Sequence, residues 1–305
     1  MKHFRILTMI ALAALLTAGF TACDDNTTDP VDTDPVLAAP TNLKAASAHG
    51  AVFLSWTASF DENESNFGSY KITVTNNTTG ETLAPRTAGK GINSIRVDGL
   101  TNGVRYQFTI RSVTDLGKDG TTFATIEWSP AVRQNTDKNG LPIKVYATTS
   151  TMFNSAIDLY NSNGDAEVIP QIGQIFQDRG DLYVHATNST SAIEIISPDN
   201  ANNQGLETQF SSATPLALDD LDGQLAAEPP ASATYSIKKL TVQTGSATAG
   251  RVFWGRIIRG NDMYYFRLLV KKGSNGSLIQ GSGNDRYLEM AVSFQNAPNN
   301  PFAKH

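Results

Sequence analysis

Short runs of alternating apolar and polar residues, separated by turn-forming residues, constrain the fold of this chain more than any other feature. In AVFLSW, Val52, Leu54 and Trp56 fall on one side of an extended segment. The same period of two recurs in GSYKITVT and in SIRVDGLTNGVRYQFTIRSV, where Asp98-Gly99 and Asn102-Gly103 supply turns. Strands show side chains to alternate faces, and no helical stretch separates these runs. The pattern predicts an antiparallel β-sandwich.

The second half of the chain has a similar pattern and predicts a second, larger β-sandwich or jelly-roll-like domain over residues 141–305. A polar segment over residues 135–140 is the expected linker. A helical turn is expected over residues 219–225, or over 153–160 if that stretch is not a strand. Eight segments rich in β-branched and aromatic residues are predicted as strands: IKVYAT, EVIPQIGQIFQ, DLYVHAT, AIEIIS, TYSIKKLTVQT, RVFWGRIIRG, MYYFRLLVKK and YLEMAVSFQ. The fold class is therefore all-β.

Composition narrows the classes of function. The formal charge of −5 offers no basic stripe for phosphate groups, so nucleic acid is not an expected partner. The chain has 1 Cys, which excludes an intramolecular disulfide and a zinc site built from several thiolates. Packing of apolar side chains, which make up 40% of the 305 residues, must therefore stabilise the domains.

The single cysteine follows a segment with the features of a secretory signal peptide. Lys2 and Arg5 precede a mostly apolar run that is too short for a bilayer-spanning helix of about 20 residues. Phe20-Thr21-Ala22-Cys23 resembles the lipobox of bacterial lipoproteins, although the family usually has Leu where this chain has Phe20. The resemblance implies removal of residues 1–22 and lipidation of Cys23, which then anchors the chain to a membrane. A plain signal peptide that leaves a free thiol is the alternative.

Residues 23–36 are expected to form a disordered acidic tether. Asp, Thr, Asn and Pro dominate this segment, and its like charges repel each other. An acidic run after the lipidated cysteine resembles the export signal of surface lipoproteins in some Gram-negative bacteria. We therefore expect an outer membrane lipoprotein exposed at the cell surface, with an anchor facing the periplasm as the alternative.

Several motifs in the first sandwich resemble the fibronectin type III family over residues 37–136. They are Val52-Phe53-Leu54-Ser55-Trp56, Gly68-Ser69-Tyr70, Leu100-Thr101-Asn102-Gly103-Val104-Arg105-Tyr106 and Trp128-Ser129-Pro130. The resemblance implies that Trp56 is the buried core tryptophan and that Tyr106 is the tyrosine corner, with its hydroxyl bonded to nearby backbone. Asn102 departs from the proline common in the family. In bacterial extracellular proteins such domains resemble spacers or interaction modules.

The chain carries few signs of catalysis, and no catalytic residue, metal site or cofactor is predicted. His185 is the only histidine of the second domain before His305, and a lone strand histidine is more often packed than catalytic. The segments 161–167 and 219–223 carry carboxylates that suit a calcium site or, for the second, a glycosidase pair, but a polar loop and an exposed turn fit them better.

The best candidates for ligand binding lie on a predicted hairpin that turns at residues 259–262. If the hairpin places Trp254, Arg256, Tyr265 and Arg267 on one exposed face, they form an aromatic and guanidinium platform. Such a platform suits a sugar, because rings stack on pyranose C–H faces and guanidinium groups bind hydroxyls. The alternative is that both faces of the hairpin are buried.

These expectations combine into a lipid-anchored surface protein for binding or adhesion, which is not an enzyme. The fibronectin type III domain is the expected spacer, and residues 141–305 are the module that recognises a glycan or a surface protein. A glycan-degrading hydrolase is one alternative, which two facing carboxylates about 5 to 9.5 Å apart in a cleft favour. A non-catalytic structural or assembly lipoprotein is the other, which one large apolar patch favours.

Overall fold

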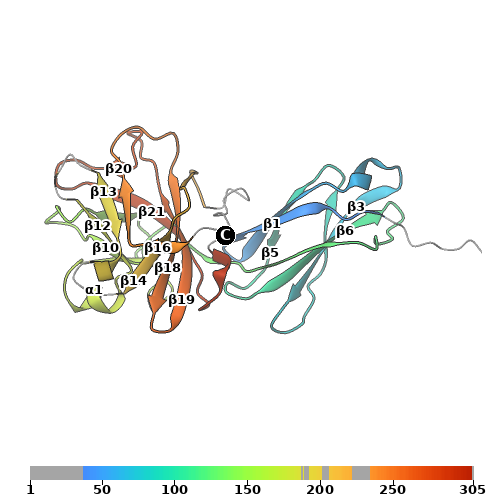
Figure 1. The fold of residues 1–305 in the computed structure, drawn as a ribbon, viewed down its shortest axis with the longest axis horizontal. Helices are drawn as coiled ribbons and strands as arrows, with labels where there is room; N and C mark the ends of the chain where they lie inside the picture. The colour runs from blue at the N-terminus through green and yellow to red at the C-terminus, as the bar shows by residue number, and fades with distance from the viewer. Residues whose placement is uncertain (1–36, 187, 189–191, 201–205, 222–233, 304–305) are drawn as a thin grey trace, which may run out of the picture. The chain divides into compact units, whose positions relative to one another are not determined.

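Two β-sandwiches make up the described part of the chain, which a computed structural model shows for residues 37–186, 188, 192–200, 206–221 and 234–303 (Figure 1). The predicted signal, the lipidation site Cys23 and the acidic tether fall outside these ranges. Within them, no helix has the length and apolarity needed to cross a bilayer.

The N-terminal sandwich consists of two antiparallel sheets. The three-stranded sheet has the order β1-β2-β5 and the four-stranded sheet the order β4-β3-β6-β7. The first contains β1 (Thr41–Ala48), β2 (Ala51–Thr57) and β5 (Ser94–Asp98), and the second contains β3 (Phe67–Asn76), β4 (Arg86–Gly89), β6 (Tyr106–Thr114) and β7 (Ala124–Trp128). A short 3-10 helix, η1 (Phe60–Asn63), connects the sheets between β2 and β3. The predicted period of two is visible in β3, where alternate residues from Tyr70 to Val74 are buried.

The C-terminal sandwich also consists of two antiparallel sheets. Its five-stranded sheet has the order β11-β10-β12-β13-β17. These strands are β10 (Ala156–Asp158), β11 (Glu167–Ile169), β12 (Leu182–His185), β13 (Ile193–Ile196) and β17 (Lys239–Val242). The hairpins β10-β11 and β12-β13 follow each other along the chain, as the alternation of strands and turns predicted.

The second sheet of this sandwich has nine strands, with β18 and β19 at its centre. Its main path is β16-β14-β18-β19-β21-β20; β15 pairs with β18, and β8 and β9 pair with β21. The strands are β8 (Val132–Gln134), β9 (Ile143–Tyr146), β14 (Glu207–Ser211), β15 (Leu216–Ala217), β16 (Tyr235–Ile237), β18 (Arg251–Arg259), β19 (Asp262–Val270), β20 (Ile279–Gln280) and β21 (Tyr287–Phe294). Thus β8, which lies inside the predicted first domain 37–136, pairs with a strand of the second.

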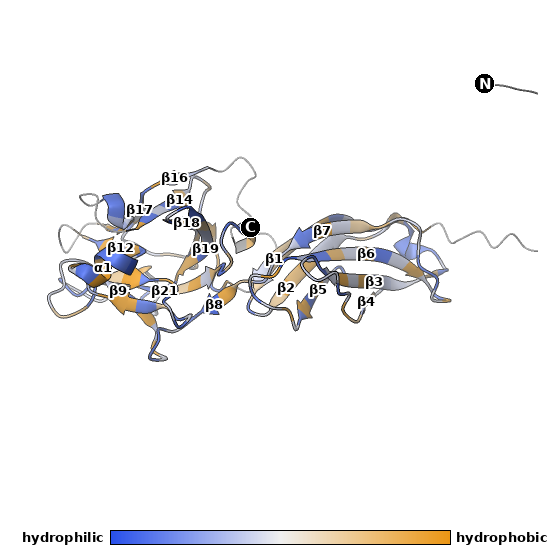
Figure 2. Cartoon of the chain, turned by 90° about the horizontal axis from the view of Figure 1, so that it is seen from below, coloured by the Kyte–Doolittle hydropathy of each residue, from blue (hydrophilic) through white to orange (hydrophobic). Residues whose placement is uncertain are grey.

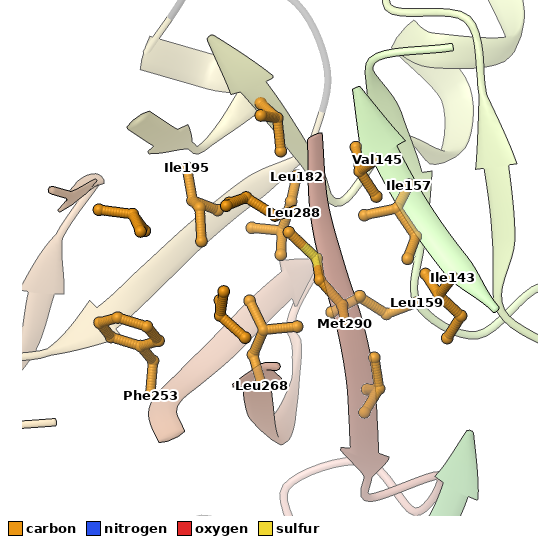
Figure 3. Packing of buried hydrophobic residues seen from close by; sticks show 14 of the residues in the cluster. Ile143, Val145, Ile157, Leu159, Leu182, Ile195, Phe253, Leu268, Leu288 and Met290 are labelled. Atoms are coloured by element: carbon orange, nitrogen blue, oxygen red, sulfur yellow. The ribbon is translucent and has the colours of Figure 1, made fainter. Parts of the chain in front are cut away.

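Apolar side chains from both sheets meet between them and form the core of the C-terminal sandwich. Figure 3 shows Leu182 and Ile195 on one side of this core and Phe253, Leu268 and Met290 on the other. Each side chain of this size contributes about 1.5–3 kcal/mol when it leaves water. The strands of both sandwiches carry hydrophobic residues interspersed with hydrophilic ones (Figure 2). Each sheet therefore has a face that packs against the other sheet.

A glycine inside β18 shows how closely the two central strands pack. Gly255 lies opposite Phe266 of β19. A Cβ atom at Gly255 would lie 2.2 Å from Cζ of the Phe266 ring. Gly255 is therefore required because the ring lies directly over the backbone of β18.

Some of the predicted strands are divided in the structure: TYSIKKLTVQT forms β16 and β17, which belong to different sheets. The expected strand EVIPQIGQIFQ is a strand only over β11, and its second half is the helix α1 (Gln174–Arg179). Pro170 cannot donate to a ladder, and Gly173 has a φ of 86°, so the extended chain ends between them. Residues 156–158 form β10, so the condition for a helical turn over 153–160 is not met. Two further 3-10 helices complete the described elements: η2 (Pro198–Asn200) and η3 (Pro301–Ala303).

Candidate functional site

The four residues of the predicted platform lie together, but they are not exposed. Strand pairing places Trp254 opposite Arg267 and Arg256 opposite Tyr265. Trp254 is 2%, Arg267 1% and Tyr265 7% exposed. Only Arg256 is half-buried, and its guanidinium group donates to Oε1 of Gln209, with Nε at 2.8 Å.

Neighbouring segments cover this face of the hairpin. Nη2 of Arg267 donates to the carbonyl oxygen of Ser47 in β1, 2.6 Å away. The Tyr265 ring meets the Tyr235 ring edge to face at 5.9 Å and packs against Ala131. The structure therefore agrees with the buried alternative and not with an exposed platform, because alternation shows which residues share a face but not what covers it.

The charged groups that the sequence analysis missed gather at one edge of the C-terminal sandwich. Asp158 ends β10, Asp181 precedes β12, and Arg259 ends β18. Nη2 of Arg259 lies 2.9 and 3.0 Å from the two carboxylate oxygens of Asp181 and 3.6 Å from Oδ1 of Asp158. Arg259 therefore joins carboxylates from two neighbouring strands of the opposite sheet.

A second guanidinium group reaches the same cluster from α1. Arg179 donates to both oxygens of Glu167 at 2.7 and 3.1 Å, and its Nη1 lies 3.4 Å from Oδ2 of Asp158. Glu167 is paired with Asp158 across the β10-β11 ladder, and Nζ of Lys138 lies 2.8 Å from it. Asp158 is thus the carboxylate between two arginines that each have a closer partner.

Burial and neighbouring charge shift the pKa values of these acids in opposite directions. Burial and, to a smaller extent, the negative charge of Asp181 raise the pKa of Asp158 to about 7, against the effect of Arg259. Burial also raises the pKa of Asp181, so these two carboxyl groups titrate as a pair. The hydrogen bonds from Arg179 hold the pKa of Glu167 at about 2. Since Asp158 has the longer contacts, we assign the proton near neutral pH to Asp158.

An open cavity of about 450 Å³ lies beside this cluster. The side chains of Asp158, Arg179 and Arg259 line it together with two tyrosines, Tyr160 and Tyr264. Both tyrosine rings stack on the buried Phe294, Tyr160 at 5.0 Å and Tyr264 at 6.0 Å between ring centroids. The cavity therefore combines two supported aromatic rings with charged groups of both signs.

One sequence signal would have pointed to this cluster. Asp158 stands within the apolar run Ala156-Ile157-Asp158-Leu159, and Asp181 directly precedes the apolar start of β12. A carboxylate inside a buried strand needs a partner, so each of these residues implied a nearby cation. The sequence alone did not show that both acids share Arg259, which lies 78 residues beyond Asp181.

The comparison with protein families concerns the N-terminal sandwich. Residues 38–126 match the family model of the fibronectin type III domain. The chain therefore contains a fibronectin type III domain. None of the curated proteins matches the sequence.

Three solved structures are similar to parts of this chain at low identity. A structure titled as that of a myokine has 12% identity, covering 30% of this chain and 97% of its own, with a TM-score of 0.25. The FN5 domain of Drosophila Lar has 19% identity, coverage of 32% and 100%, and a TM-score of 0.24. A segment of two fibronectin type III domains from chicken tenascin has 11% identity, coverage of 76% and 98%, and a TM-score of 0.28. The assignment above rests on the family match and the sheet order.

Two aromatic residues hold the core of the fibronectin type III domain. Trp56 is buried, and its ring meets Tyr70 edge to face at 5.5 Å. Tyr106 is buried, and its hydroxyl accepts a hydrogen bond from the backbone N–H of Thr101 at 3.0 Å. This is the geometry that the resemblance implied for a tyrosine corner.

The other polar residues named in the sequence analysis make structural hydrogen bonds in the part of the chain that the structure describes. Oδ1 of Asn161 accepts from the backbone N–H groups of Asn163 and Asp165, which closes the β10-β11 hairpin. Asp219 accepts from the N–H of Gly250, and Nδ1 of His185 lies 2.9 Å from Oγ1 of Thr148. Among the described residues, no group of three or more His, Cys, Asp or Glu side chains is placed to hold a metal ion.

Proposed function

We propose that this chain is a surface binding protein whose C-terminal sandwich recognises a glycan in the cavity beside Asp158. Lipid on Cys23 anchors the chain to the outer membrane, and the fibronectin type III domain is the spacer. The membrane is thus one partner and a glycan the other. The observation that carries the proposal is the cavity itself, which brings Tyr160 and Tyr264 together with Asp158, Arg179 and Arg259.

The composition of the cavity suits a saccharide. Aromatic rings pack against the C–H face of a pyranose, while carboxylates accept and guanidinium groups donate hydrogen bonds to hydroxyls. The ring stack on Phe294 and the ion pairs of the two arginines hold these groups in place before a ligand arrives. A site organised in advance loses less conformational entropy on binding.

Binding fits the cavity better than hydrolysis. A glycosidase needs two carboxyl groups that reach the same sugar from one cleft. Asp158 lines the cavity, whereas Asp181 is not one of its lining residues and has both of its oxygens on Arg259. A structural or assembly role also fits less well, because the domain has a polar cavity.

A glycan array with the whole chain tests the proposal. Binding is expected in the unmodified chain and is expected to be lost in the double variant Arg179→Ala, Tyr264→Ala, which removes one guanidinium group and one ring from the cavity. The matched control is Phe60→Ala, which removes a 91% exposed ring from the fibronectin type III domain. Absence of glycan binding by the folded chain, or equal loss in the control, would overturn the proposal.

A further inference from the structure

Asp158 is the weakest ionic partner of both guanidinium groups in the cavity. Its carboxylate lies 3.4 Å from Nη1 of Arg179 and 3.6 Å from Nη2 of Arg259. Each arginine has a closer acid: Glu167 for Arg179 at 2.7 Å and Asp181 for Arg259 at 2.9 Å. The side of each guanidinium group toward Asp158 is therefore the side where another acid can compete.

Both arginines remain open to the cavity. The side chain of Arg179 is 37% and that of Arg259 29% exposed. Nε of Arg259 is buried and makes no hydrogen bond to any residue in the described ranges. Guanidinium groups bind carboxylates and phosphates with good geometry and strength. A carboxylate, that of Asp158, is the group that already contacts both arginines in this cavity.

Charged and titratable groups from several neighbouring segments surround Asp158. They are Glu167 of β11, which pairs with Lys138; Arg179 of α1; Asp181 before β12; and Arg259 of β18, which lies over the ring of Tyr264 of β19. With all acids ionised, the carboxylates of Asp158, Glu167 and Asp181 balance the cations Lys138, Arg179 and Arg259. A further carboxylate therefore enters at low electrostatic cost only when one of these acids is neutral.

Building on the proposed function, we propose that the cavity takes a saccharide that carries a carboxylate, a hexuronic acid, and that its carboxylate replaces that of Asp158 as the partner of Arg179 and Arg259. Asp158 is neutral in the complex and takes up a proton from solvent where the free chain has it ionised, so the ligand adds no net charge relative to the fully ionised cluster. The pyranose ring packs against the tyrosines that line the same cavity.

The titration of Asp158 agrees with this exchange. Its pKa of about 7 means that the carboxyl group takes up a proton near neutral pH. If only the neutral form admits the ligand, the apparent affinity follows the neutral fraction, which is about tenfold smaller at pH 8 than at pH 6. Binding of an uncharged sugar would show no such loss.

The test uses the whole chain and pairs of sugars that differ only in charge. Calorimetry at pH 6 and pH 8 measures binding of oligosaccharides of glucuronic, galacturonic, mannuronic and guluronic acid, each beside its methyl ester. The ester keeps the ring and hydroxyls and removes the charge. At least one acid is expected to bind at pH 6, about tenfold more weakly at pH 8, and more tightly than its ester at pH 6.

A variant isolates the role of Asp158. Asp158→Asn keeps the size of the side chain and removes its charge, so the acid is expected to bind with equal affinity at pH 6 and pH 8. The matched control Asp220→Asn changes an exposed acid and is expected to keep the tenfold difference. If Asp158→Asn fails to fold, the comparison of acid and ester in the unmodified chain still decides.

The outcomes separate this inference from the function on which it rests. Equal affinity for acids and esters, or an affinity that does not change with pH, overturns the inference. Binding of neutral glycans alone on the array overturns it too, while the proposed glycan recognition stands. Absence of all glycan binding overturns both.

Discussion

The guanidinium group of Arg267 donates a hydrogen bond to the backbone carbonyl of Ser47, although the two residues lie 220 positions apart. Arg267 is 1% exposed, so this bond joins a buried charge in β19 to the end of β1. Oγ of Ser47 in turn accepts from Nε1 of Trp128 and donates to the carbonyl oxygen of Ser129. This network accounts for the burial of Arg267, which the platform hypothesis placed on an exposed face.

Replacing Arg267 should destabilise the chain strongly. Arg267→Ala leaves a cavity and removes a donor from the Ser47 carbonyl, so we expect the free energy of unfolding to fall by about 3 kcal/mol. Urea denaturation measures the change. The control Arg96→Ala breaks an exposed ion pair with Asp98 and should cost less than about 1 kcal/mol. Equal losses of stability in the two variants would contradict the claim that the buried Arg267 contributes more than an exposed ion pair.

The tyrosine corner predicts a smaller loss within the fibronectin type III domain. Tyr106→Phe keeps the ring and leaves the Thr101 N–H without its acceptor, so the free energy of unfolding should fall by about 1–2 kcal/mol. In Tyr146→Phe, the hydroxyl removed has no hydrogen bond within the described ranges, and its ring still stacks on Phe153 at 4.2 Å. The thermal unfolding temperature of this control should be almost unchanged. A comparable loss in the control would show that the hydrogen bond of the Tyr106 hydroxyl is not the cause of the destabilisation.

The raised pKa of Asp158 predicts how stability depends on pH. The ordinary value is 3.8 and the folded value about 7, so the folded chain holds this proton more tightly over the interval between them. The stability that this proton contributes is fully present below pH 3.8, falls as the pH rises, and is lost above pH 7. Between pH 5 and pH 8 the loss is about 2 kcal/mol. Asp158→Asn should lose this dependence in denaturation measured from pH 5 to pH 8, and Asp220→Asn should retain it. A slope that is the same in all three proteins would show that Asp158 ionises normally.

The proposed anchor predicts a change of compartment. Cys23→Ser removes the sulfur that carries lipid, so incorporation of labelled palmitate should cease and the chain should leave the membrane fraction. The neighbouring change Asn26→Ser should leave both measurements unaltered. Protease treatment of intact cells then distinguishes the surface from the periplasmic face. Membrane association that persists in Cys23→Ser would exclude lipid on this residue as the anchor.

The sequence predicted the class of fold because strand signals are local. Alternation in residues 70–74 and the Asn102-Gly103 turn need no knowledge of distant residues. The same reasoning predicted the hairpin that turns at Arg259 to Asp262, which the ladder between β18 and β19 shows. It was wrong for EVIPQIGQIFQ, where Pro170 and Gly173 divide one apolar run into a strand and a helix.

The sequence did not show which residues form the candidate site, because its members come from separate segments. Asp158, Arg179 and Arg259 are far apart along the chain, and none stands in a recognisable motif. Their meeting depends on the packing of two sheets and α1, which brings side chains of opposite charge within 4 Å.

The sequence by itself determined most of the strands and turns, and which side chains of one strand share a face, because these follow from the local period of the backbone. It also determined the fibronectin type III domain, whose motifs lie in one stretch of the chain. Only the tertiary structure decided which faces are open. Trp254 and Arg267 share a face as predicted, yet β1 and its neighbours cover them, while Asp158 at the end of a buried strand reaches a cavity. Burial is a property of what packs against a residue, and pairing between distant segments sets it.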